Sequence, residues 1–225
     1  MPGVEIAHSD LSRLDFARTS VFIDFDGTIS STDVGVHVLS KAAPDSWRAI
    51  DEQFRHGVID SRECILDEWE LVEGDEETLR AIAAEVTLDP GVGPLVDALR
   101  AAGAELTVVS DGFGFYVEDA VRPFGLDVLT NAVDFSTREL QFPNEDRCCP
   151  CASCGTCKQA PLKDAAYRGQ TTVLIGDGAS DRKAALLADV VFAKDALASW
   201  CAAFGVEFTP FTTLTDVHQM WFPSS

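Results

Sequence analysis

Long apolar runs and clustered basic residues are both missing from this sequence. Residues 1–20 mix acidic with small polar side chains, and no stretch reaches the about 18 consecutive apolar residues of a membrane-spanning helix. We therefore expect neither a secretory signal peptide nor a membrane span, and we interpret the chain as a cytoplasmic protein. The 17 Lys and Arg are outnumbered by 37 Asp and Glu, which gives a formal net charge of −20. Nucleic acids and anionic membranes attract clustered cations, so we expect neither as a partner.

Cysteine is rare outside one short segment. Of the seven cysteines, five lie in residues 148–157. In a reducing compartment such a cluster indicates metal binding or packing before disulfides. Cys148, Cys151, Cys154 and Cys157 have the spacing of a tetrahedral zinc site, with C-x-x-C repeated. Three alternatives stay open here: structural Zn²⁺, a disulfide or redox-sensitive pair, and packed free thiols.

Apolar runs without alternation are present, and they are short. They occupy residues 21–25, 106–110, 171–177 and 190–193. Such runs are typical of strands that are buried on both faces of a parallel sheet. Helical stretches such as residues 93–103 lie between them. The alternation predicts an α/β fold with a Rossmann-like parallel sheet and right-handed crossovers.

The alternation of strands and helices is interrupted twice. Residues 32–90 show helical periodicity only, which predicts a helical cap domain inserted after the first strand. The core domain then consists of residues 1–31 and 91–225. Residues 131–157 predict a small β-hairpin, followed by the cysteine-rich loop.

Acidic side chains follow two of the predicted strands. Asp24 and Asp26 end the first, and Asp177 and Asp181 lie in the turn after the third, while Ser110 closes the second. Ligands of parallel sheets bind beyond the carboxyl ends of the strands, so we expect these five residues at one edge. Carboxylates this close repel unless a cation lies among them or some are protonated. Mg²⁺ fits, because it prefers oxygen ligands and retains waters and substrate phosphate.

The turns that hold these acids also suit a phosphoryl group. The candidate donors are the backbone N–H groups of Gly27, Thr28 and Gly112 and the Ser110 hydroxyl. Asp24 could then attack phosphorus and form an aspartyl-phosphate, while Asp26 protonates the leaving oxygen and later deprotonates water. A single D-x-D before a turn is as often a capping or surface pair. The prediction depends on three such turns in one chain.

These motifs resemble those of the haloacid dehalogenase superfamily. D-F-D-G-T (24–28), V-V-S-D-G (108–112) and G-D-G-A-S-D (176–181) match its first, second and fourth motifs. The resemblance is to phosphatases with a helical cap after the first motif. It implies that Asp24, Asp177 and the backbone carbonyl of Asp26 hold Mg²⁺. Asp181 would not bind the ion directly but would contact its ligands or waters, and Ser110 would bind phosphate. It also implies phosphoester hydrolysis, because dehalogenases and P-type pumps lack an aspartate at position 26.

The superfamily's third motif is a lysine, for which Lys158 and Lys163 are candidates. C-G-T-C-K-Q-A-P-L (154–162) resembles an element of the methionine-salvage phosphatases, and a related element occurs in phosphoethanolamine/phosphocholine phosphatases. This resemblance places the catalytic lysine at Lys158, where it would neutralise the nucleophile and bind phosphate.

Three further acids bear on the substrate. Asp33 aligns where phosphoserine phosphatases place a glutamate for the substrate's amino group, although it could equally be a helix N-cap. Glu68 aligns where they place an arginine for the substrate's carboxylate, which disfavours phosphoserine. Asp111 stands where glycine is commoner in the second motif. We expect its side chain to turn away from the phosphate or to bind a helix N-terminus.

The sequence thus predicts a Mg²⁺-dependent phosphomonoesterase that acts on a small phosphorylated metabolite through an aspartyl-phosphate. Two alternatives stay open. One is a phosphomutase or phosphotransferase of the same superfamily. The other is a phospho-accepting signalling module, which is disfavoured because such modules are much shorter and have no helical insert. Nothing in the sequence indicates an oligomeric state.

Overall fold

A mostly parallel sheet forms the centre of the molecule. The computed structural model of the chain describes residues 14–144 and 153–223. In these residues the sheet has the strand order β4-β3-β2-β1-β5-β6-β7, and only β4 is antiparallel to its neighbour. The strands are β1 (Thr19–Ile23), β2 (Glu105–Phe113), β3 (Asp127–Asp134), β4 (Glu139–Gln141), β5 (Thr171–Gly176), β6 (Val190–Ala193) and β7 (Thr209–Pro210). The predicted α/β class and its four strands are confirmed.

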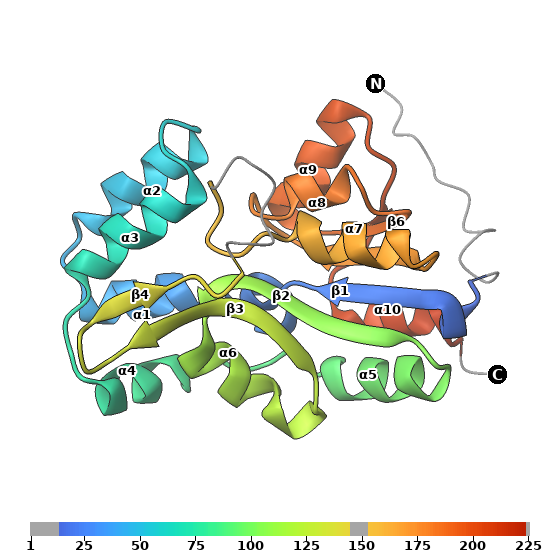
Figure 1. Cartoon of the computed structure of the whole chain (residues 1–225), viewed down its shortest axis with the longest axis horizontal. Coiled ribbons are helices and arrows are strands. Elements are labelled where there is room, and N and C mark those ends of the chain that lie inside the picture. The colour runs from blue at the N-terminus through green and yellow to red at the C-terminus, as the bar shows by residue number, and fades with distance from the viewer. Residues whose placement is uncertain (1–13, 145–152, 224–225) are drawn as a thin grey trace.

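Helices cover both faces of this sheet (Figure 1). They are α5 (Val92–Ala101), α6 (Gly114–Val121), α7 (Gln159–Tyr167), α8 (Arg182–Ala185), α9 (Asp195–Phe204) and α10 (Leu214–Trp221). Successive side chains of β1 pack on opposite faces of the sheet. Val21 and Ile23 belong to the core that includes α5, α6 and α10, whereas Phe22 belongs to the core that includes α7, α8 and α9. Burial on both faces explains why β1 is apolar without alternation.

The predicted hairpin is present, but it belongs to the main sheet. β3 and β4 pair through Ala132↔Gln141 and Asp134↔Glu139. β3 also pairs in parallel with β2, so the hairpin extends one edge of the sheet. The sequence did not indicate this, because a local turn pattern identifies one neighbour of a strand only.

Four helices follow the first turn, as the helical periodicity predicts. They are α1 (Val34–Ala42), α2 (Trp47–Arg55), α3 (Ser61–Leu71) and α4 (Glu76–Ala83), and we call them the cap helices. Three begin at an aspartate whose carboxylate accepts a backbone N–H of the first turn: Asp33, Asp60 and Asp75. α2 packs on α3 and α1 on α4, and Figure 1 shows α2 and α3 at the upper left, above β3 and β4. Their separation as a domain of residues 32–90 stays a prediction.

Among the described helices, none combines the length and apolar content that a bilayer crossing requires. The cytoplasmic location stays a prediction.

Candidate active site

The first turn of the site follows β1 directly. The backbone N–H of Asp24 still bonds to the Ile175 carbonyl of β5 at 2.9 Å, and the chain then leaves the sheet. Gly27 has φ of +76°, and a Cβ there would lie 2.5 Å from Asp177 Oδ2. Glycine therefore meets both demands of this turn, a left-handed backbone and close approach to the turn after β5.

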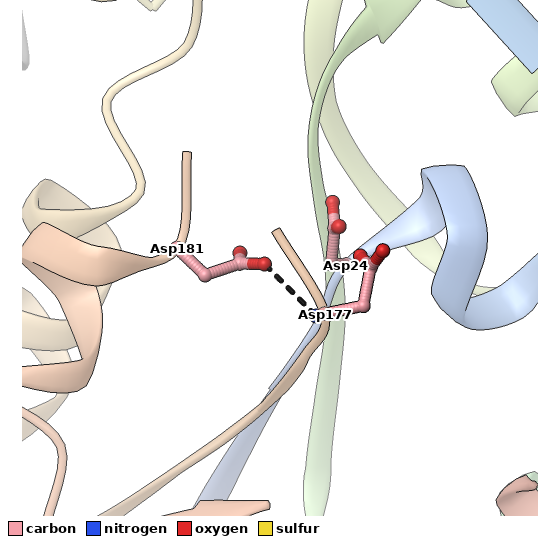
Figure 2. Close-up of side chains that lie close together, drawn as sticks. All are labelled: Asp24, Asp177 and Asp181. Atoms are coloured by element: carbon pink, nitrogen blue, oxygen red, sulfur yellow. Dashed lines mark hydrogen bonds between the residues drawn. The ribbon is translucent and has the colours of Figure 1, made fainter. Parts of the chain in front are cut away.

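Three carboxylates meet where β1 and β5 end. Asp24, Asp177 and Asp181 each offer an oxygen, and these oxygens lie within 4.8 Å of one another (Figure 2). Asp24 and Asp181 are buried. Burial, followed by the charge of Asp181, raises the pKa of Asp24 well above its usual range, and the same causes raise the pKa of Asp177. Three carboxylates in a largely buried position repel one another, and a bound cation would reduce this repulsion.

Lys158 lies against this group, as predicted. Its Nζ is 2.5 Å from Asp24 Oδ1 and 2.7 Å from Asp181 Oδ1, and the side chain is buried. Burial opposes its charge, but the carboxylates of Asp181 and Asp24 outweigh burial and raise the pKa of Lys158. Lys163, the other candidate, is exposed and its Nζ is 3.5 Å from Gln159 Oε1. The structure thus brings Lys158 to the site and leaves Lys163 on the surface.

The side chain of Asp26 lies outside the three-carboxylate group. Its Oδ1 accepts the backbone N–H of Val34 at 3.0 Å, and its Oδ2 accepts the hydroxyls of Ser110 at 3.2 Å and Tyr116 at 3.5 Å. Burial, and then the charge of Asp33, raise the pKa of Asp26 to about 8. The carboxyl group is therefore biased towards its protonated form at neutral pH. Sequence reasoning missed Tyr116, although it stands within a Phe-rich run after the second motif.

The predicted phosphate donors surround the same point, with partners of their own. The N–H of Gly27 bonds to Ser30 Oγ at 3.1 Å, and that of Gly112 bonds to Ser110 Oγ at 2.9 Å. Thr28 donates its hydroxyl to Asp177 Oδ1 at 3.2 Å. A bound phosphoryl group would have to share or replace these bonds. These residues are therefore near the site, while their role in binding phosphate stays a prediction.

A cavity of about 220 Å³ joins these turns to the cap helices. Asp24, Asp26 and Asp177 line one end of it, and Asp33, Asp51 and Glu68 line the cap side. Between them the wall is mainly apolar and includes Leu39, Phe54, Ile65, Trp69 and Phe113. Among the described residues, none of those lining this cavity is Lys, Arg or His.

The acids on the cap side differ in their contacts. Asp33 lines the cavity and also caps α1, with its Oδ1 2.8 Å from the backbone nitrogen of Val36. Both interpretations of this residue therefore fit the geometry. Burial and then the charges of Asp51 and Asp33 raise the pKa of Glu68 to about 8. Asp51 carries no signal in the sequence, because nothing around it departs from an ordinary amphipathic helix.

Asp111 turns its carboxylate towards the start of α3. Its Oδ2 accepts the hydroxyl of Ser61, the first residue of α3, at 2.6 Å, and its Oδ1 accepts the backbone N–H of Thr156 at 2.7 Å. The predicted contact with a helix N-terminus is thus present, through a side chain hydroxyl.

The predicted zinc site has no support. Cys148 and Cys151 lie outside the described residues. Cys157 is buried and Cys154 is half-buried. Within the described part of the chain, the group of possible metal ligands is the aspartate group described above.

Comparisons with known proteins agree with this geometry. A family model described as haloacid dehalogenase-like hydrolase matches residues 21–186. The chain is 30% identical over 206 residues to the 2-hydroxy-3-keto-5-methylthiopentenyl-1-phosphate phosphatase of Brevibacillus brevis, covering 88% of this chain and 92% of the relative. It is 28% identical over 207 residues to the enzyme of the same name from an Exiguobacterium species, covering 88% and 95%.

Solved structures show the same fold. The structure of a phospho-aspartyl intermediate analogue of phosphoserine phosphatase has a TM-score of 0.72 at 17% identity. The match covers 91% of this chain and 99% of that one. A substrate-bound phosphoserine phosphatase complex has a TM-score of 0.70 at 17% identity, covering 91% and 98%.

We expect Glu68 to make stability depend on pH. Its pKa is about 8 in the folded chain against 4.5 for an ordinary glutamate, so the folded state holds the proton more tightly and stability falls as pH rises through this range. Glu68→Gln has no proton to lose. It should match the wild type near pH 4.5 and exceed it by about 2 kcal/mol above pH 8, after allowance for solvent screening.

Urea unfolding from pH 4.5 to 9 without divalent cations measures this difference. Glu70→Gln, an exposed position of the same helix, is the matched control and should leave the profile of the wild type unchanged. A Glu68→Gln profile parallel to that of the wild type would show that burial and its acidic neighbours do not act on Glu68.

Proposed function

The chain belongs to the haloacid dehalogenase-like hydrolases and is a phosphatase, and we propose that Asp24 carries the phosphoryl group while the protein hydrolyses a small phosphate monoester. The contact that carries the proposal is the one between Asp24 and Lys158, both buried at the end of the central strand. A carboxylate paired with a buried cation there is placed to meet an incoming phosphate.

The proposed reaction has two displacements. Asp24 attacks phosphorus, and as the new P–O bond forms, the bond to the leaving oxygen breaks and Asp26 donates a proton to that oxygen. Water then attacks the aspartyl-phosphate, with Asp26 accepting its proton, and inorganic phosphate leaves. A carboxyl group with a pKa of about 8 suits the first role at neutral pH. Lys158 neutralises charge on the phosphoryl oxygens throughout.

Magnesium is the metal we propose for the acidic turns. Its ligands would be the carboxylates of Asp24 and Asp177 and the backbone carbonyl of Asp26, since the crowded oxygens fit a cation that prefers oxygen ligands. When bound, it would offset the charge of the phosphoryl group. Asp181 accepts the backbone N–H groups of Asp177 and Gly178 at 3.2 and 3.1 Å, so its role would be to hold this turn and Lys158 in place.

The cavity supports a leaving group without a carboxylate. The cap side of the cavity, where the leaving group would lie, is lined by Asp33, Asp51 and Glu68. Among the described residues, no Lys, Arg or His lines the cavity. An extra carboxylate about 4 Å from one ionised acid would be repelled by on the order of 4 kcal/mol at an effective dielectric constant of 20. Glu68, with a pKa of about 8, would be mostly protonated at pH 7 and would still offer that carboxylate no positive charge. The apolar wall suits an uncharged chain, such as the one named in the curated relatives' substrate. We propose this class, and not phosphoserine, as the substrate.

Replacing the nucleophile tests the reaction. Asp24→Asn should lower the rate of phosphate release from p-nitrophenyl phosphate by about 10³-fold or more, because an amide does not form the acyl-phosphate. Asp97→Asn, an exposed position on α5, is the control and should retain full turnover. Undiminished turnover by Asp24→Asn contradicts the proposal. A single turnover by the wild type would favour a signalling module. With a sugar phosphate as substrate, an isomerised product with little free phosphate would favour a phosphomutase.

Thermal melting with added Mg²⁺ tests the metal site separately from activity. Binding to the folded chain should raise its stability by about 2.7 kcal/mol at a hundredfold excess over the dissociation constant. Asp177→Asn should remove most of this rise in melting temperature, while Asp97→Asn should keep it. An equal rise in all three proteins would place the bound ion elsewhere.

Phosphoserine and phosphoethanolamine differ by one carboxylate and therefore test the substrate class. We expect kcat/KM for phosphoserine to be at least about 10-fold lower, because of repulsion by the acids on the cap side. Glu68→Gln should reduce this ratio at pH 9, where Glu68, with its pKa of about 8, is charged, and should change the ratio less at pH 7. Equal kcat/KM values for the two esters in the wild type would contradict the proposed recognition.

A further inference from the structure

The Asp111 carboxylate joins two segments that are distant in sequence. One oxygen accepts the Ser61 hydroxyl at the start of α3, 50 positions away, and the other accepts the backbone N–H of Thr156, 45 positions away. Each oxygen thus has its own partner. Asp111 follows Ser110 in the last part of β2, so these contacts connect the sheet to a cap helix and to the segment before α7.

Other contacts hold the same three parts together. Asn131 of β3 donates to the Asp111 backbone carbonyl at 2.6 Å and accepts the Thr156 hydroxyl at 3.2 Å. The backbone N–H of Arg62 in α3 donates to the Ser153 carbonyl at 3.4 Å. The segment also fits closely against α3, since a Cβ on Gly155 would lie 2.7 Å from Ile65 Cδ1. The Asp111 contacts are therefore part of a packed junction.

The two partners of Asp111 lead to different parts of the site. Thr156 precedes Lys158 by two residues, and Lys158 binds Asp24 and Asp181. Ser61 begins the helix that supplies Ile65, Glu68 and Trp69 to the cavity wall. The segment with the lysine and the helix beside the leaving group are thus bonded to opposite oxygens of one carboxylate.

We propose that Asp111 is a positioning residue that sets the cap helix α3 and the Lys158 segment in register with each other. The proposal rests on the proposed function, because it concerns the same site. The two donors require two acceptor oxygens, and a carboxylate provides both. The glycine that is commoner at this position of the second motif has no side chain and provides neither. Loss of the Ser61 contact should loosen the leaving-group side only. Loss of Asp111 should disturb both sides.

The experiment measures kcat and KM with p-nitrophenyl phosphate, whose aromatic leaving group must lie beside α3. Ser61→Ala should raise KM by about 5-fold and change kcat by less than about 2-fold, as expected for one lost hydrogen bond away from the lysine. Asp111→Ala should raise KM similarly and also lower kcat by about 10-fold. Asp111→Asn should recover most of kcat, because its amide oxygen can still accept from Thr156 while its NH₂ donates to Ser61.

The double variant supplies the test of coupling. If both donors act through Asp111, Ser61→Ala should have no further effect in the Asp111→Ala background. Ser199→Ala, an exposed hydroxyl on α9 that bonds to the Asp195 carbonyl, is the control for serine removal and should match the wild type. Circular dichroism and melting temperature establish that each variant is folded.

Three results would overturn the role of Asp111. They are unchanged kinetics in Asp111→Ala, effects of the two substitutions that multiply in the double variant, and an Asp111→Asn variant as impaired as Asp111→Ala, which would assign the effect to charge. Each presupposes a wild type that is active and depends on Asp24. Activity that survives Asp24→Asn would instead overturn the proposed function.

Discussion

The structure depends on how like charges are tolerated at the ends of two adjacent strands. Asp24, Asp177 and Asp181 place their carboxylates together in a largely buried position, and the ammonium group of Lys158 contacts two of them. Buried ions are costly unless they are paired and hydrogen-bonded. Three acids and one lysine leave an excess of negative charge. Burial, and then the charge of Asp181, raise the pKa of Asp24, and the same excess makes the group suitable for a divalent cation.

The sheet topology brings these charges together. β1 lies between β2 and β5, so the turns after these three parallel strands must leave the sheet at one edge. From β1 the chain first continues to β2 on one side and later returns to β5 on the other side. In open parallel sheets, a crevice forms where the strand order reverses in this way. The cap helices begin directly beyond the first turn. Their attachment at this position places their apolar side chains over the crevice that the turns create.

Local sequence predicted the parts of the site that depend on strand ends. Asp24, Ser110 and Asp177 follow apolar runs, and topology alone places such residues at one edge. Lys158 was identified by family resemblance, because it starts a helix and follows no strand. The partners of Asp111 and the contribution of Asp51 were not predictable. These depend on how the cap helices pack on the core, and residues 45 or 50 positions apart leave no periodic signal.

The distribution of charge in the cavity also determines how a substrate must lie. Both ends are acidic, so an anionic phosphate gains nothing from proximity to Glu68 on the cap side. At the other end Lys158 lies behind Asp24, and a cation among the aspartates would add positive charge there. We therefore expect a phosphate ester to be attracted at that end only, with its organic part directed along the apolar wall. The lack of a cation among the described residues of the cap side would thus orient the substrate without a specific contact to the leaving group.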